Sequence, residues 1–242
     1  MGNKIIFSGH QPNMMPWLGY FYKIFQSDVF VFVDDVQFIK KGSSYTNTIQ
    51  INRRGDIIKL AVPIKRISGE TQNINEITYA KNNWQKKILR TLELNYGRCD
   101  YYKEHKDFIF DLINTKFDNY SEYNIHFIKE ISKKLEFETE FRISSQIDKG
   151  EIKDATDRIV KLAKAVNATH FISGRGGDNY QNHDLYKENG IELIYSDFID
   201  FEYKQYKTEE FVKGISIIDA IFNIGFANLK THFIEIKKGN KQ

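Results

Sequence analysis

The chain has 242 residues, of which 41% are hydrophobic and 14% aromatic, and its formal net charge is +3. This composition supports a substantial buried core and excludes a disordered or fibrous protein. The net charge is small and the lysines are scattered among acidic residues, so the sequence does not indicate nucleic-acid binding.

The cellular location is predicted from what the sequence lacks. A single cysteine, Cys99, excludes an intramolecular disulfide framework and favours a reducing compartment. The first residues lack the long apolar stretch of a signal peptide, and no segment approaches the ~20 apolar residues that span a bilayer. We therefore expect a cytoplasmic protein that does not insert into a membrane.

The first forty residues predict a βαβ unit. Residues 5–7 and 29–33 are short apolar runs that read as buried strands, and the apolar side chains between them recur at helical spacing. Such units normally lie in a parallel sheet, and ligands of such sheets bind beyond the carboxyl ends of the strands. Residues 8–12 and 34–37 should both lie at that edge.

The rest of the chain predicts more strands and helices of the same class. Residues 48–52 and 57–64 should form an antiparallel hairpin, and helical patterns at 83–94, 106–116 and 124–135 indicate a helical insertion at about 81–136. Strands are expected at 139–144, 170–172 and 191–196, and helices at 154–166, 182–189 and 215–222. We expect one α/β domain over residues 1–242, with a Rossmann-like, largely parallel sheet, an antiparallel hairpin excursion and a helical insertion.

The turn after the first strand is the first candidate site. Two of the three prolines, Pro12 and Pro16, bracket this short segment and stiffen it. His10 can act as an acid, a base or a hydrogen-bond donor near neutral pH, and Gln11 offers an amide that donates and accepts. The alternative is that His10 only bonds backbone groups at the end of the strand.

Two carboxylates, Asp34 and Asp35, follow the second strand. They could position a substrate amine or hydroxyl, hold a magnesium ion, or cap the next segment. Neighbouring residues of a strand point to opposite faces, so a regular strand would turn only one of the two toward the site. The polar segment that follows includes Gln37, Lys40 and Asn47, which could contact phosphates or sugar hydroxyls or could form a solvated loop.

A glycine-rich turn follows the strand at 170–172. Ser173 and Gly174 lead into Arg175, and such a turn can bring backbone amides and a guanidinium close to an anion. An ordinary turn between strand and helix is the alternative. Ser144 could likewise lie at the catalytic edge or cap a helix. Asp219 and Asn223 share one face of an apolar helix, where they line a site or tie helices together.

The motifs taken together resemble one family. In this order they resemble the WbqC-like proteins over nearly the full chain. The motifs are residues 10–12, 16–21 and 28–38, the Ser144-Ser145 turn, Ser173-Gly174, and residues 216–219 and 222–225. The segment at residues 175–179 is richer in glycine and charge than this resemblance leads us to expect.

The resemblance implies a role in bacterial surface polysaccharide, or O-antigen, biosynthesis. We expect a transferase that acylates or aminoacylates the amine of a nucleotide-linked amino-sugar, with no tightly bound cofactor or metal and with acyl-CoA or another activated donor as co-substrate. Self-association is left open. His10 would act as base, Asp34 or Asp35 would orient the amine, and Gln11 would hold the oxyanion. Arg175 would anchor the diphosphate. The further substrate contacts expected are Ser8, Trp17, Tyr20, Gln37, Lys40, Asn47, Ser144, Ser173, Gly174, Asp219 and Asn223.

Two other functions stay open. The strand, histidine-containing turn and helix are similar to nucleotidyltransferases with a HIGH-type motif, although Tyr20 stands where that motif has its second histidine. Such an enzyme would need a nucleoside triphosphate and magnesium. A carbohydrate-binding scaffold is the non-catalytic alternative, with Trp17 and Tyr20 stacking on sugars.

Overall fold

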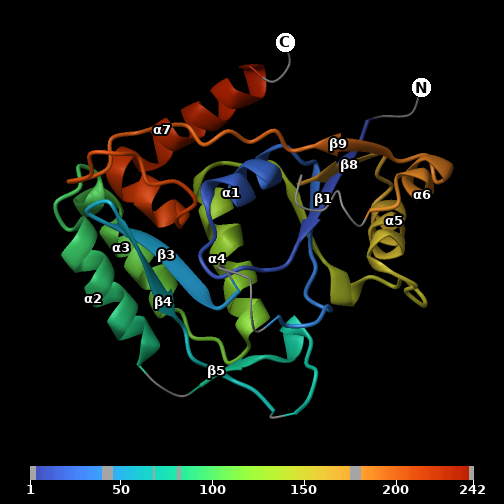
Figure 1. The fold of residues 1–242 in the computed structure, drawn as a ribbon, viewed down its shortest axis with the longest axis horizontal. Coiled ribbons are helices and arrows are strands. Elements are labelled where there is room, and N and C mark those ends of the chain that lie inside the picture. Colours follow the sequence, from blue (N-terminus) through green and yellow to red (C-terminus); the bar gives the residue numbers. More distant parts are fainter. Residues whose placement is uncertain (1–3, 40–45, 68, 81–82, 175–180, 240–242) are drawn as a thin grey trace.

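The computed structural model describes residues 4–39, 46–67, 69–80, 83–174 and 181–239. It has three layers, in which a central sheet is covered by helices on both faces (Figure 1). None of the helices in these ranges has the length and apolar character needed to cross a bilayer.

The central sheet confirms the predicted α/β class. Five parallel strands pair in the order β7-β2-β1-β8-β9. They are β1 (Ile6–His10), β2 (Val29–Phe32), β7 (Glu140–Ile143), β8 (His170–Ser173) and β9 (Glu192–Tyr195). The chain passes outward from β1 to β2 and β7, then returns to the other side of β1 for β8 and β9. This is the strand order of the doubly wound fold, and its topological switch point lies between β1 and β8.

Alternating side chains of β2 supply both halves of the core. Phe30 and Phe32 are fully buried in the larger cluster, with α1 (Leu18–Phe25), α4 (Tyr120–Lys134) and α7 (Ile217–Gly239). Val31 faces the other way, toward α5 (Ala155–Ala165) and α6 (His183–Glu188). Because both faces are covered by helices, the strand is continuously apolar, as a buried parallel strand requires.

The predicted hairpin excursion is present and lies outside the central sheet. β3 (Thr48–Arg53) and β4 (Asp56–Ala61) form an antiparallel pair, followed by the short strands β5 (Ile64–Lys65) and β6 (Thr78–Tyr79) and the 3-10 turn η1 (Ile74–Glu76). Arg54 and Gly55, which both have positive φ, form the centre of the turn, and Asp56 pairs with Arg53.

The helical insertion is also confirmed. It consists of α2 (Trp84–Tyr96), α3 (Tyr102–Asn114) and α4, and each of the last two begins four residues earlier than the apolar pattern indicated. The closing helix α7 runs to Gly239, well beyond the expected end at residue 222, and has a kink at Gly225. The φ of Gly225 is 76°, and a Cβ atom there would lie 2.6 Å from the ring of Tyr101. Glycine is therefore required by conformation and by space.

The remaining elements lie close to their expected positions. The 3-10 turn η2 (Ser144–Gln146) follows β7 directly, and α5, β8, α6 and β9 each end within two residues of the prediction. Asp154 and Asn182 cap α5 and α6 through their side chains. These caps fix the two helix starts next to the carboxyl edge of the sheet.

Candidate functional site

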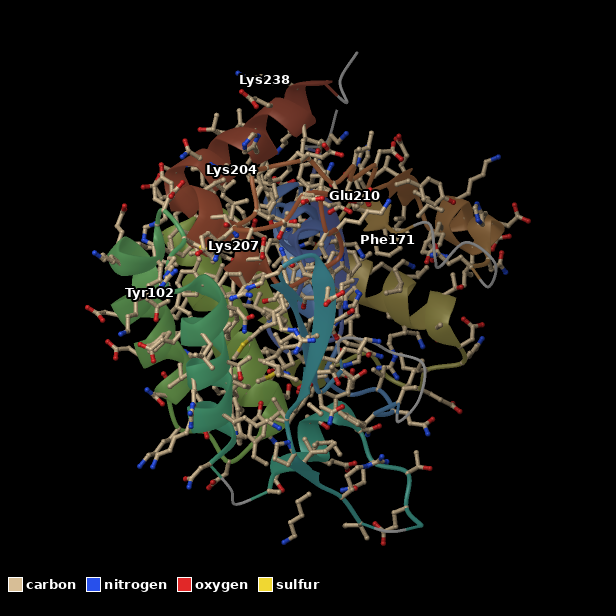
Figure 2. The ribbon with its side chains drawn as sticks, turned by 60° about the vertical axis from the view of Figure 1, so that its left-hand side comes forward. Tyr102, Phe171, Lys204, Lys207, Glu210 and Lys238 are labelled. Atoms are coloured by element: carbon tan, nitrogen blue, oxygen red, sulfur yellow. The ribbon has the colours of Figure 1, made fainter. Side chains whose placement is uncertain are left out.

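A pocket of about 480 Å³ lies at the topological switch point. It is formed by the carboxyl ends of β1 and β8, by α1 and by the first turn of α5, and Phe171 of β8 lies beside α5 on this side of the molecule (Figure 2). We call it the switch-point pocket. Its polar lining residues include His10, Lys23, Thr156, Ser173 and Gln181. Its position and size are those of a small-molecule site in a doubly wound fold.

His10 is held in the pocket by its backbone turn and by two aromatic rings. Its Nδ1 lies 3.1 Å from the carbonyl oxygen of Gln11, which also accepts a hydrogen bond from the hydroxyl of Tyr20. Because a carbonyl only accepts, Nδ1 carries the proton in the neutral ring and Nε2 keeps a free lone pair. The rings of Tyr20 and Trp17 meet the imidazole edge-on, with centroids 4.9 and 5.8 Å away.

Lys23 brings a positive charge to the same pocket. Its ammonium donates to the carbonyl oxygen of Gly9 at 3.3 Å, and among the described residues no carboxylate lies within ion-pair distance of it. Burial lowers the pKa of Lys23 to about 8, so most of the molecules carry the charge at pH 7. Burial, together with this charge, lowers the pKa of His10 to about 4. His10 is therefore neutral at physiological pH.

Three further polar groups line the wall opposite α1. The Nε2 of Gln181 donates to the hydroxyl of Ser173 at 2.6 Å, while its Oε1 is buried without a partner in the described structure. The hydroxyl of Thr156, in the first turn of α5, accepts from the backbone of Asn182. The pocket thus places one cation, one neutral imidazole and several uncharged hydrogen-bonding groups around an open space.

The two carboxylates Asp34 and Asp35 lie elsewhere. Asp34 is buried and accepts from the backbone and the hydroxyl of Ser145, at 2.9 and 2.7 Å. Asp35 accepts from the hydroxyl of Ser144 at 2.7 Å. Neither carboxylate lines the switch-point pocket, so this placement does not support a direct role in orienting a substrate amine.

Asp35 is also paired with two cations. The ammonium of Lys149 and the guanidinium of Arg158 each lie 3.0 Å from its Oδ2. Burial alone would raise the pKa of Asp35, but the hydrogen bond from Ser144 and the two cations lower it below its ordinary value. We call Asp34, Asp35 and their four partners the carboxylate cluster. It joins the segment after β2 to the turn after β7.

Ser8 lies inside the protein rather than at a ligand site. It is fully buried, and its hydroxyl lies 2.6 Å from that of Ser27. Gln37 is exposed and pairs with Asn73 through the backbone, and Asn47 donates to the carbonyl oxygen of Val62 at 3.0 Å. Their placement gives all three a structural contact, and none of them lines the switch-point pocket. Lys40 and Arg175 lie outside the described residues.

Asp219 and Asn223 belong to a separate buried network. Asp219 is fully buried and accepts from the hydroxyl of Tyr203 at 2.7 Å and from Gln205 at 3.0 Å. Burial raises its pKa to about 6, although these hydrogen bonds act in the opposite direction. Asn223 accepts from the backbone of Tyr206. The two side chains tie α7 to the segment before it, as one of the two sequence interpretations expected.

The structure therefore unites some of the predicted residues and separates others. His10, Trp17, Ser173 and Gly174 line one pocket, and Tyr20, which is only 2% exposed, supports His10 from behind. The side chain of Gln11 is not among the lining groups; only its carbonyl oxygen contributes, by orienting His10.

Sequence reasoning missed Lys23, Thr156 and Gln181. A signal for Lys23 was present, because it is the only charged residue of the otherwise apolar helix α1. It also missed Asn124, a fully buried side chain of α4 that donates to the carbonyl oxygen of Pro12 at 2.9 Å and so holds the turn after β1 in place. Within the described ranges, no group of three or more His, Cys, Asp or Glu side chains is arranged to hold a metal ion.

Residues 11–231 match the family model of the WbqC-like protein family. The chain belongs to the WbqC-like protein family. It is also 27% identical over 217 residues to "Uncharacterized protein Rv1507c" of Mycobacterium tuberculosis, an alignment that covers 89% of this chain and 92% of the relative. No solved structure matches this chain.

The family match begins at Gln11, directly after His10, and ends at Thr231, within α7. It therefore spans all of the pocket except its β1 side, and it spans the carboxylate cluster and the Asp219 network as well. For this WbqC-like chain, the site is defined by geometry, because the name of the mycobacterial relative assigns no activity.

Proposed function

We propose that this WbqC-like protein is a transferase that acylates or aminoacylates the amine of a nucleotide-linked amino-sugar in bacterial surface polysaccharide biosynthesis. One observation carries the proposal: Lys23 and a neutral His10 line the same pocket at the topological switch point. In such a pair, Lys23 can bind an anionic group of the substrate, and His10 can remove a proton from the substrate's nucleophile.

Lys23 supports the anionic part of the substrate. A partly buried ammonium with no carboxylate partner among the described residues attracts a diphosphate, and the low dielectric of the pocket strengthens that attraction. Thr156, Ser173 and Gln181 offer hydrogen bonds to sugar hydroxyls, and Trp17 offers an aromatic ring on which a sugar can pack.

His10 supports the chemical step. The amine nitrogen bonds to the carbonyl carbon of the activated donor while Nε2 of His10 takes a proton from that nitrogen. The bond to the leaving group then breaks, and the proton passes from His10 to the leaving group. Because Lys23 contributes to the low pKa of His10, a bound diphosphate that neutralises Lys23 makes His10 a stronger base. Substrate binding thus prepares the base.

The test combines ligand binding with two matched pairs of variants. The purified full-length protein is heated with UDP-glucosamine, with acetyl-CoA, or with ATP and Mg²⁺, because a ligand that binds only the native state raises the melting temperature. We expect UDP-glucosamine to stabilise the protein. Lys23→Met should weaken this binding about 10- to 100-fold, the effect of losing a hydrogen bond to a charged group. Lys164→Met, which changes an exposed lysine at the end of α5, should have no effect.

His10→Ala should keep ligand binding and lower amide formation, followed by mass spectrometry, by about 10² to 10⁴. His170→Ala is its control, since His170 lies at the opposite end of β8 from the pocket. Stabilisation by ATP with Mg²⁺ alone would overturn the proposal in favour of nucleotidyl transfer. Unchanged turnover in His10→Ala would exclude His10 as the base, and binding without any turnover would indicate a carbohydrate-binding scaffold.

A further inference from the structure

A second pocket, of about 440 Å³, lies away from the switch-point pocket. It is lined by Arg54, from the turn between β3 and β4, by Arg98, from the loop between α2 and α3, by Tyr102, at the start of α3, and by Lys207, from the segment before α7. We call it the α2–α3 pocket. It shares no lining residue with the switch-point pocket, and Figure 2 shows Tyr102 and Lys207 on the side of the α2 and α3 helices, apart from Phe171.

The α2–α3 pocket has an excess of positive charge. Arg54, Arg98 and Lys207 are exposed, and none of them has an ion-pair partner among the residues that the structure describes. One carboxylate, Glu93, also lines the pocket, but its Oε1 lies 3.5 Å from Lys106. The carbonyl groups at the carboxyl end of α2 offset only about half a charge. The three cations outnumber the one carboxylate of the pocket, and this excess of positive charge favours an anion between them.

Tyr102 supplies an independent observation. The residue is only 5% exposed, and its buried hydroxyl finds no hydrogen-bond partner within the described part of the chain. Burial and, to a smaller extent, the carboxylates of Glu93 and Asp107 raise the pKa of Tyr102 to about 12, so the hydroxyl keeps its proton at physiological pH. A buried donor without an acceptor is destabilising, and native structures rarely keep one without a reason. A local shift that opens this hydroxyl to the pocket would let an anionic oxygen accept its hydrogen bond.

We propose that the α2–α3 pocket is a second ligand site, which binds a phosphoryl or pyrophosphoryl group. Arg98 and Arg54 present guanidinium groups that can bind phosphate oxygens in pairs, Lys207 adds a third charge, and Tyr102 donates from the wall. Leu94, which is 75% exposed, also lines this pocket. The phosphoryl group can therefore belong to a free metabolite or to the headgroup of an anionic lipid.

The experiment uses the Lys23→Met variant of the protein as background, so that the switch-point pocket contributes little to binding. Inorganic pyrophosphate is titrated into this protein by calorimetry. We expect saturable binding that weakens as salt is added, because the contacts are ionic. Adding Arg98→Gln and Lys207→Gln should lower the affinity at least tenfold. Adding Lys133→Gln and Lys164→Gln instead removes two exposed charges elsewhere and should leave the affinity unchanged.

Tyr102→Phe tests the buried donor separately. It keeps the ring in place, so we expect several-fold weaker pyrophosphate binding with no loss of melting temperature in the absence of ligand. Sedimentation with phosphatidylglycerol vesicles distinguishes the two sources: co-sedimentation that Arg98→Gln and Lys207→Gln abolish indicates a lipid headgroup, and pyrophosphate binding alone indicates a free metabolite. The proposal is overturned if the background protein binds neither probe, or if the Arg98→Gln and Lys207→Gln protein binds as well as its charge-matched control.

Discussion

The carboxylate cluster and the switch-point pocket lie at the same edge of the sheet, but they differ in whether their polar groups have partners. In the cluster, the oxygens of Asp34 and Asp35 are occupied by serine, lysine and arginine donors. In the pocket, Nε2 of His10 and the charge of Lys23 have no such partner among the described residues. Polar groups that complete one another stabilise a fold, whereas polar groups left open facing a pocket are available to a ligand.

The largest expected effect on stability comes from breaking the cluster. Asp35→Ala leaves Lys149 and Arg158 without their shared carboxylate, and removing one partner of a largely buried ion pair typically costs about 3 kcal/mol. Chemical denaturation at pH 7 measures this difference. Asp35→Ala should leave UDP-glucosamine binding nearly unchanged in the protein that remains folded. A loss of binding larger than the loss of stability would mean that Asp35 contributes to the ligand site.

The difference in stability between wild type and Asp35→Ala should depend on pH, and the direction of that dependence follows from the pKa of Asp35. The pKa of Asp35 is lowered in the folded protein, so its contribution is fully present above the unfolded pKa of about 4 and is lost as the pH falls through the folded value. The stabilities of wild type and Asp35→Ala should therefore converge in acid. A constant difference down to pH 2 would contradict this account.

A smaller effect of opposite sign is expected in the pocket. The pKa of Lys23 falls from 10.5 to about 8 on folding, so at pH 7 the folded protein holds a charge in an unfavourable environment. Lys23→Met removes that cost and should raise the free energy of unfolding by about 1–3 kcal/mol, while it weakens ligand binding. A gain in stability with a loss of binding is typical of a site shaped by its ligand.

The gain should also depend on pH. Between pH 8 and about 10.5 the unfolded chain binds more protons at Lys23 than the folded chain, so the wild type becomes more stable as the pH rises. The advantage of Lys23→Met should shrink over this range, as measured by urea denaturation at several pH values. Lys164→Met, the exposed control, should show no such trend.

The sequence was sufficient to predict the elements that position the site. Apolar runs at residues 5–7 and 29–33 predicted β1 and β2, and their parallel pairing placed His10 at the carboxyl edge of the sheet. The turn after β8 was predicted at the same edge, and Ser173 and Gly174 do line the pocket with His10. These predictions rest on local pattern and on a general rule of parallel sheets, and neither requires knowledge of long-range packing.

What could not be predicted depends on contacts between distant segments. Asp34 and Asp35 read as site residues because they follow β2, but their partners Ser144 and Ser145 are more than 100 residues away. Only the pairing of β7 with β2 brings these groups together. Lys23 was missed for a related reason: its side chain reaches the pocket because α1 packs against β1, where it meets the carbonyl oxygen of Gly9.

Ser8→Ala has the smallest expected effect on stability. It tests whether two residues of one strand, Ser8 and His10, are correctly divided into a buried structural contact and a ligand contact. Ser8 and His10 are two positions apart, so they face the same side of β1, and the sequence assigned both to the site. His10, the last residue of β1, lines the pocket, whereas Ser8 is fully buried against Ser27. The hydroxyl of Ser27 still donates to the carbonyl oxygen of Lys23 when Ser8 is truncated, so no donor is left unmet. Ser8→Ala should therefore cost about 1 kcal/mol in urea denaturation and leave the affinity for UDP-glucosamine unchanged. A weakened affinity without a loss of stability would return Ser8 to the ligand site, and would mean that the strand interior and the pocket are not separate at this edge of the sheet.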